Sequence, residues 1–168
     1  LPENSPVYAQ GNSDFYEAYR FILPGYNVRP TELNAAVGLE QMKKFPAMTA
    51  ARRSNLALFQ KLFQNDERFI IQKENGTSSA FCFPMIPNPD IDIDRRKIFA
   101  ALDEADIGYR IITGGNILRH DVIKYYDYET QGEIVNANIA HDSGFFVGNH
   151  PHDLSLQLER LKSVLDSI

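Results

Sequence analysis

The stretch that most constrains the fold is residues 23–44, where a turn runs directly into a helix with the sequence LPGYNVRPTELNAAVGLEQMKK. A Pro-Gly pair marks the turn, and Pro30 ends the extended part that follows it. Thr31 is a natural N-cap, because its hydroxyl can accept a backbone N–H of the first helical turn. Apolar residues then recur at helical spacing, which predicts a helix over residues 31–45.

Two polar side chains lie in this turn, Asn27 and Arg29, just before the helix begins. An amide and a guanidinium beside the free backbone N–H groups of a helix start are suited to an anion such as a phosphate. The alternative is an ordinary helix start with solvated polar residues. The spacing alone leaves both interpretations open.

Composition excludes several classes of protein. The 168-residue chain has 43% hydrophobic and 23% charged residues, a balance typical of a soluble domain long enough to bury a core. Its net charge is −5 and it has no clustered basic face, which argues against nucleic acid as a partner. The arginine pairs at 52–53 and 95–96 are expected to lie on solvated helix faces.

Cysteine usage and hydropathy indicate the compartment. Cys82 is the only cysteine, so no internal disulfide forms, and its phenylalanine neighbours favour a small buried hydrophobe over a nucleophile. No apolar run approaches the roughly 18–20 residues of a membrane span, and the N-terminus lacks the regions of a signal peptide. We therefore expect a cytoplasmic protein with no membrane partner. Because the chain does not begin with Met, we also expect a fragment.

Past residue 45, Pro46 is expected to break or kink the chain. A second helix is then predicted over residues 47–64. Its apolar stripe, which we expect to face the core, consists of Met48, Ala51, Leu56, Phe59 and Phe63. Residues 14–22 carry four aromatics and are predicted to be extended, packing either on this domain's own core or on another chain.

The remaining pattern predicts short strands and helices in turn. We expect strands at residues 69–71, 79–86, 109–112 and 144–147, helices at 95–105 and 154–165, and a short helix at 121–125, with 134–140 a helical turn or a loop. This order predicts one α+β domain, with a small, mostly antiparallel sheet and helices on one face. We place that domain at residues 31–168, with residues 1–30 as an aromatic-rich lead-in and turn.

The sequence argues against two kinds of catalytic site, a hydrolytic site and a metal site. The chain has no G-x-S-x-G nucleophile elbow, and the glycine turn at residues 113–116 lacks dinucleotide-loop spacing, although its backbone amides could approach a phosphate. Histidines and aspartates gather in the last third, at positions His120, Asp121, His141, Asp142, His150, His152 and Asp153. Their spacing is not that of zinc ligands, so we expect no metal and assign His150 and His152 capping or surface roles.

The stretch G-Y-N-V-R-P-T-E-L-N-A-A-V-G-L-E-Q resembles the signature of the StrS/DegT-type sugar aminotransferases and sugar 3-dehydratases. These are pyridoxal-phosphate enzymes of fold type I that act on nucleotide-linked keto-sugars. Two further stretches, residues 110–126 and 141–151, are similar to the 3-dehydratase branch, of the GDP-4-keto-6-deoxymannose 3-dehydratase type. An aminotransferase of the same family is the alternative.

The resemblance implies that the chain is the C-terminal small domain of such an enzyme, with the N-terminal cofactor domain absent. It implies pyridoxal 5'-phosphate or pyridoxamine 5'-phosphate as cofactor, a nucleotide-sugar substrate, and a homodimer with shared active sites. Asn27 and Arg29 would contact the cofactor phosphate of the partner subunit. The cofactor-binding lysine, or the histidine that replaces it in the dehydratase branch, would lie upstream, so no catalytic residue is expected here.

The resemblance also places Asn116, Arg119 and His120 near the sugar-nucleotide pocket, with a purely structural loop as the alternative. It points to lipopolysaccharide or O-antigen sugar biosynthesis, and to a chain that is inactive on its own and binds cofactor very weakly or not at all. A hypothesis of another class is a stand-alone, non-catalytic interaction module. Such a module should start with Met near Leu1, whereas a truncated enzyme should continue upstream.

Overall fold

The computed structural model describes residues 19–26 and 29–168. Along them the order is α2 (Glu32–Met42), α3 (Phe45–Phe63), β1 (Phe69–Ile71), β2 (Cys82–Pro87), α4 (Arg95–Glu104), β3 (Tyr109–Ile111), η1 (Ile117–Arg119), η2 (Asp121–Tyr125), α5 (Val135–Ser143), β4 (Phe145–Gly148) and α6 (Ser155–Asp166). The strands form a four-stranded antiparallel sheet in the order β1-β2-β4-β3. The predicted α+β class is confirmed.

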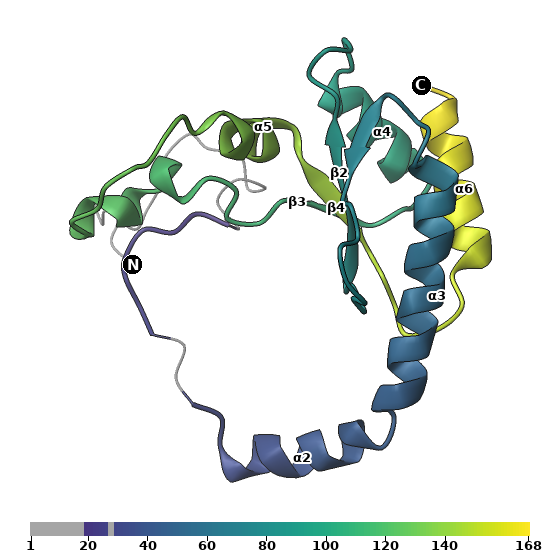
Figure 1. Ribbon diagram of the computed structural model, residues 1–168, viewed down its shortest axis with the longest axis horizontal. Coiled ribbons are helices and arrows are strands. Elements are labelled where there is room, and N and C mark those ends of the chain that lie inside the picture. The colour runs from purple at the N-terminus through teal and green to yellow at the C-terminus, as the bar shows by residue number, and fades with distance from the viewer. Residues whose placement is uncertain (1–18, 27–28) are drawn as a thin grey trace.

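Helices α3, α4 and α6 cover one face of this sheet (Figure 1), and α6 contacts both of the others. The core lies between these helices and the sheet, because alternate residues of β2 and β4 point toward them. Its most deeply buried side chains are Phe59, Phe63, Phe83, Met85, Ile98, Leu102, Phe145 and Leu165. Of the predicted α3 stripe, Leu56, Phe59 and Phe63 are buried, whereas Met48 and Ala51 are half-buried.

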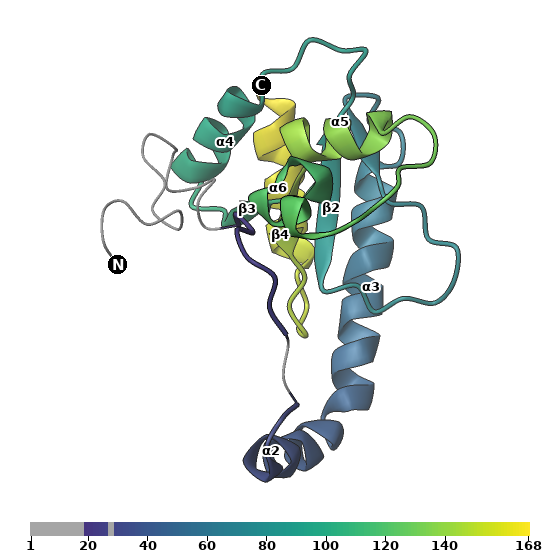
Figure 2. The same ribbon diagram turned by 90° about the vertical axis from the view of Figure 1, so that its left-hand side faces the viewer.

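The opposite face is covered as well, which the sequence did not predict. Helix α5 contacts β2, and Figure 2 shows it in front of the sheet with α6 behind. The expectation of helices on one face only was therefore wrong. The sequence did not decide whether residues 134–140 form a helix or a loop, because α5 has no buried residue and no clear apolar stripe.

The predicted break near Pro46 lies slightly earlier than expected. Helix α2 ends at Met42, and α3 begins at Phe45 with the proline in its first turn. Proline fits that position, because the N–H it lacks would have no helical partner there and its φ angle suits a helix. The chain bends between the two helices, and α2 points away from the rest of the domain (Figure 1).

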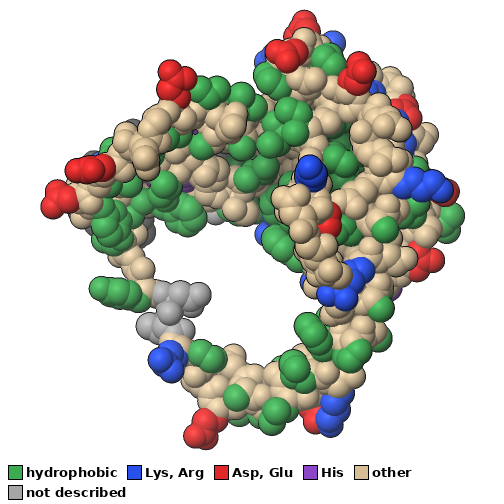
Figure 3. Space-filling view, viewed as in Figure 1, with side chains coloured by type: hydrophobic (Ala, Val, Ile, Leu, Met, Phe, Trp, Pro, Cys, Tyr) green, Lys and Arg blue, Asp and Glu red, His purple; other side chains and the backbone are tan. Residues whose placement is uncertain are grey.

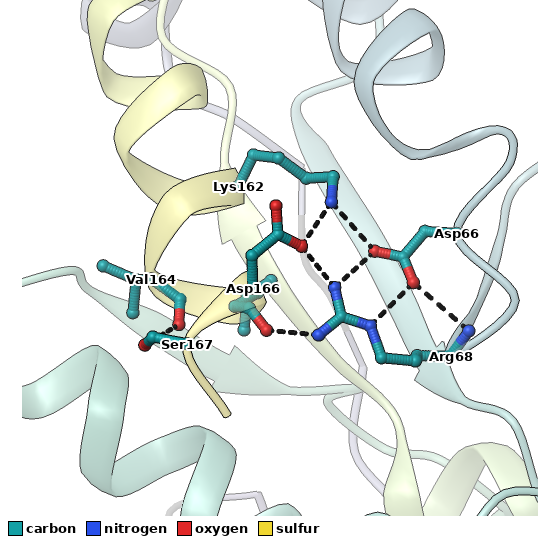
Figure 4. A network of polar contacts seen from close by, with 7 residues as sticks. Asp66, Arg68, Lys162, Val164, Asp166 and Ser167 are labelled. Atoms are coloured by element: carbon teal, nitrogen blue, oxygen red, sulfur yellow. Dashed lines mark hydrogen bonds and ion pairs between the residues drawn. The ribbon is translucent and has the colours of Figure 1, made fainter.

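A charged network joins the turn after α3 to the end of α6 (Figure 4). The Asp66 carboxylate accepts hydrogen bonds from the Arg68 guanidinium at 2.7 and 2.8 Å. Lys162 lies 3.3 Å from Asp66, and Arg68 also donates to the Leu165 carbonyl and to Asp166. These hydrogen bonds from Arg68 hold the pKa of the Asp66 carboxyl below its ordinary value.

We expect Asp66→Asn to lower the free energy of unfolding by about 1–3 kcal/mol at pH 7, because hydrogen bonds to a charged partner are lost. The size of this destabilisation depends on pH. A carboxyl whose folded pKa is depressed contributes its full stability above the ordinary pKa of 3.8, and this stability is lost as the pH falls from 3.8 through the lower pKa of the folded state. The variant should therefore converge on the wild type in acid. Urea unfolding between pH 7 and 3 measures this.

Asp127→Asn is the control, since Asp127 is exposed. It should leave stability within about 0.5 kcal/mol of the wild type. A difference between Asp66→Asn and wild type that stays constant from pH 7 to pH 3 would contradict the assigned role of the carboxylate.

Candidate functional site

The arm, which we define as residues 23–26 and 29–31, lies between the body of the domain and the start of α2 (Figure 1). Tyr26 is 98% exposed and Arg29 is exposed, while Asn27 lies outside the described residues. Thr31 is the N-cap of α2, as predicted. The Asn34 carboxamide oxygen accepts from its backbone N–H at 2.9 Å and from its hydroxyl at 2.7 Å. Arg29 therefore stands two residues before a capped helix N-terminus.

No residue of α2 is buried. Its exposed apolar side chains are Leu33, Val37, Leu39 and Met42. Figure 3 shows hydrophobic side chains at several points around α2, both toward the opening between this helix and the body of the domain and on its outer side. Several exposed apolar side chains on a helix with no buried residue are typical of a protein interface.

The second predicted region is the loop after β3, which we call the glycine loop (residues 112–120). Gly115 has a φ of +53°, a left-handed conformation that favours glycine. Asn116 is buried and caps η1, with its Oδ1 accepting from the Leu118 N–H at 3.0 Å. Its Nδ2 donates to Asn138 at 2.9 Å, and its backbone N–H donates to His141 Nδ1 at 3.1 Å. Asn116 thus fastens the glycine loop to α5.

His120 joins the glycine loop to the lead-in segment. It is 4% exposed, its Nδ1 lies 3.1 Å from the Phe21 N, and its Nε2 lies 2.5 Å from the Gly114 carbonyl oxygen. The Phe21 ring stands 5.1 Å from the imidazole. Beside it, Val122 N–H donates to the Phe21 carbonyl at 3.1 Å, and Arg20 pairs with Asp121.

Arg119 is the predicted substrate residue whose side chain reaches the surface, at 43% exposed. It forms an ion pair with Asp142 at 2.5 Å. The neighbouring His141 is partly buried, which lowers its pKa below the ordinary value, and the Arg119 charge lowers it further. A neutral His141 is consistent with its Nδ1 accepting from the Asn116 N–H. The loop therefore presents one arginine outward over a set of internal hydrogen bonds.

Sequence reasoning missed several members of this region. Phe21 and Asp142 stood out only as part of an aromatic run and of a histidine and aspartate group, and Asn138 did not stand out at all. The sequence did not indicate their partners, because each partner lies more than 20 positions away. Arg95 was expected to face water with Arg96. Instead it is half-buried over the Phe99 ring at 5.5 Å, and burial lowers the pKa of its guanidinium. Arg96 is solvated, as expected.

The histidines in the last third of the chain contact other parts of the protein. Within residues 19–26 and 29–168, no three His, Cys, Asp or Glu side chains are grouped as metal ligands. The rings of His150 and His152 stack at 5.5 Å, and their backbone carbonyls accept from the buried Asn55 side chain. In the same described part of the chain, no helix has the length and apolar character needed to cross a bilayer.

Together these features define a class of protein domain: a small antiparallel α+β unit whose arm carries an arginine away from its own core. The chain belongs to the DegT/DnrJ/EryC1/StrS aminotransferase family, whose sequence profile matches residues 7–168. The family resemblance seen in the sequence around the arm and the glycine loop is thereby confirmed.

Three individual relatives show which members of the family the chain is similar to. A GDP-4-keto-6-deoxy-D-mannose 3-dehydratase of Yersinia pseudotuberculosis is 41% identical over 98% of this chain and 42% of its own length. The solved Escherichia coli GDP-4-keto-6-deoxy-D-mannose-3-dehydratase with bound hydrated PLP is 38% identical, with a TM-score of 0.78 over 92% of this chain and 40% of that one. A lipopolysaccharide biosynthesis protein of Salmonella typhimurium is 27% identical over 79% of this chain and 31% of its length. The chain thus spans about two fifths of the length of the first two relatives.

The described residues fit one wall of a phosphate site. Arg29 offers an exposed guanidinium, which is suited to a phosphate oxygen pair, and α2 begins three residues later, at Glu32. The helix N-terminus adds a favourable dipole, although Glu32 in its first turn opposes an anion. This wall is consistent with a cofactor phosphate held mainly by other residues.

Proposed function

We propose that the chain is the C-terminal part of an enzyme that depends on pyridoxal or pyridoxamine 5'-phosphate. The proposed reaction is 3-dehydration of a nucleotide-linked 4-keto sugar in lipopolysaccharide or O-antigen sugar biosynthesis. The observation that carries the proposal is the 41% identity to the Yersinia dehydratase, which extends over 167 residues. When bound, the cofactor supplies an electron sink that acidifies a neighbouring C–H of the sugar.

The residues of this chain have supporting roles in that proposal. Asn27 and Arg29 hold the cofactor phosphate of a partner subunit, and the exposure of Arg29 on an arm that leaves the domain supports such a contact across subunits. Arg119 faces the anionic substrate, which competes with Asp142 for the guanidinium. Asn116 and His120 shape the loop that presents Arg119, because their side chains are buried in internal hydrogen bonds.

The experiment is an assay of the complete enzyme, with its upstream cofactor domain, on GDP-4-keto-6-deoxymannose with the cofactor and glutamate. The proposal expects loss of the 3-hydroxyl oxygen. Accumulation of a 4-amino sugar instead would identify an aminotransferase, the alternative within the same family. Turnover of neither kind would refute both. Titration of the 168-residue chain alone with pyridoxal phosphate should give no absorbance band of bound cofactor.

The proposal includes a homodimer in which the apolar face of α2 is covered. We expect Leu33→Glu to shift the complete enzyme from dimer to monomer, because a charge would be buried in the interface. Light scattering after size-exclusion chromatography measures the mass. Leu156→Glu is the matched control, since Leu156 on α6 is 77% exposed and Leu33 is 80% exposed. A Leu33→Glu enzyme that stays dimeric would contradict the assignment of this face.

A further inference from the structure

We propose that His120 is a positioning residue that clasps the lead-in segment to the glycine loop and thereby sets where the arm with Arg29 leaves the domain. We call the contact between residues 20–22 and residues 114–122 the clasp. The inference rests on the proposed function only for what the arm does. The clasp itself follows from the hydrogen bonds of this chain.

The partners of His120 fix its protonation. The Phe21 backbone N–H can only donate, so the Nδ1 atom 3.1 Å away must be an unprotonated acceptor. The Gly114 carbonyl can only accept, so the Nε2 atom 2.5 Å away must carry the proton. The imidazole is therefore neutral, in its Nε2–H form, and both nitrogens are occupied. A buried ring in this state acts through the segments that it joins rather than on a bound ligand.

The clasp has further parts that act on the same segment. The Phe21 carbonyl accepts from Val122 N–H at 3.1 Å, so the backbone of Phe21 is held on both sides. Arg20 pairs with Asp121 across the same junction. A segment without regular secondary structure is thus fixed by partners about 100 residues away in the sequence.

The glycine loop is shaped to receive Phe21. A Cβ on Gly114 would lie 2.8 Å from the Phe21 ring, closer than real contacts allow. On Gly115, which already needs its positive φ, a Cβ would lie 2.5 Å from His141 Nδ1. These two glycines therefore leave room for the Phe21 ring and for the close approach of α5. In the G-G-N-x-x-R-H pattern, Gly114 and His120 thus contact Phe21, whereas the remaining named positions contact α5.

The clasp matters because α2 has little else to hold it. No residue of α2 is buried, and its main contact is with α3 at the bend that joins them. In the sequence, Arg29 lies between the clasp and α2, so these are the two attachments on either side of it. Release of the clasp would leave the arm anchored at its α2 end alone.

The test is nuclear magnetic resonance on the 168-residue chain. Long-range ¹⁵N–¹H spectra should show His120 in the neutral Nε2–H form at neutral pH. Amide exchange should be slow at Phe21 and at Ala35, whose N–H donates to the Thr31 carbonyl in the first turn of α2. His120→Phe keeps a ring but removes the acceptor, so we expect exchange at Phe21 to accelerate about ten- to a hundredfold, with a smaller acceleration at Ala35.

His120→Asn is the rescue variant, because its Oδ1 can take the place of Nδ1 as acceptor. We expect it to restore slow exchange at Phe21 to within a few-fold of wild type. Equal acceleration in both variants, a protonated Nδ1 in the wild type, or unchanged exchange at Ala35 in His120→Phe would each overturn the proposal.

Gly114→Ala covers the case in which a His120 variant does not fold. It leaves the imidazole intact and should accelerate exchange at Phe21 by displacing the ring. Slow exchange in this variant would also overturn the clasp. Because no cofactor or substrate is present in any of these measurements, an inactive or differently active enzyme would refute the proposed function and leave the clasp untouched.

Discussion

Asn149→Asp should lower the free energy of unfolding by about 3–5 kcal/mol, because it introduces an unpaired charge where two carbonyl oxygens need donors. Asn149 is 2% exposed. Its Nδ2 donates to the carbonyls of Arg52 at 3.0 Å and Ala80 at 2.7 Å, while its Oδ1 accepts from Asn55 at 3.1 Å. A carboxylate has no proton to give either carbonyl.

The pH dependence provides a second readout for this variant. A buried carboxyl facing two carbonyls is expected to have a raised pKa, since burial and the lost donors both disfavour its charged form. The protonated acid can donate one hydrogen bond, so the destabilisation should shrink as the pH falls. Chemical unfolding at pH 7 and pH 5 measures both effects. Asn136→Asp makes the same change at an exposed site and should be nearly neutral.

A loss below 1 kcal/mol in Asn149→Asp would show that this amide does not join the elements around it. Those elements are far apart in the chain. Asn55 lies on α3, and Asn149 follows β4 at the start of the connection to α6, where Leu154 N–H donates to the Asn55 Oδ1 at 3.1 Å. The Asn55–Asn149 pair therefore sets how the first long helix meets the last.

Most of the regular structure was predictable because local patterns determine it. The helices α4 and α6 and the turn η2 lie within one or two residues of their predicted bounds, since each has an N-terminal signal or an apolar stripe. The strands were found for similar reasons, and the break near Pro46 follows from the chemistry of proline. Element boundaries shifted slightly where end turns extended or stopped early.

The candidate site was less predictable, for physical reasons visible at particular residues. The arm and its arginine could be recognised as suited to an anion, but its placement depends on Phe21 and His120, which are 99 positions apart. The sequence placed His120 near a sugar-nucleotide pocket or in a structural loop, and its burial and hydrogen bonds show that its nitrogens contact the chain itself. Buried polar contacts of high sequence separation leave no periodic trace.

Among substitutions in the hydrophobic core, we expect truncation of Phe83 to lower the free energy of unfolding the most. Its side chain is fully buried in β2 and stacks on Phe59 of α3, with ring centroids 4.7 Å apart. Phe83→Ala removes this packing and leaves a cavity that the surrounding strands cannot close. We expect a loss of about 3–5 kcal/mol in the free energy of unfolding.

Phe81→Ala is the matched control, because it makes the same chemical change two residues away on a side chain that is 66% exposed. Its ring meets Phe146 edge-on at 6.0 Å, so a loss of only about 1 kcal/mol is expected. Urea unfolding followed by circular dichroism measures both variants. Equal losses would contradict the burial of the Phe83 side chain in the core. Since β2 pairs with β4 and β4 with β3, that result would also undermine the placement of the glycine loop that follows β3.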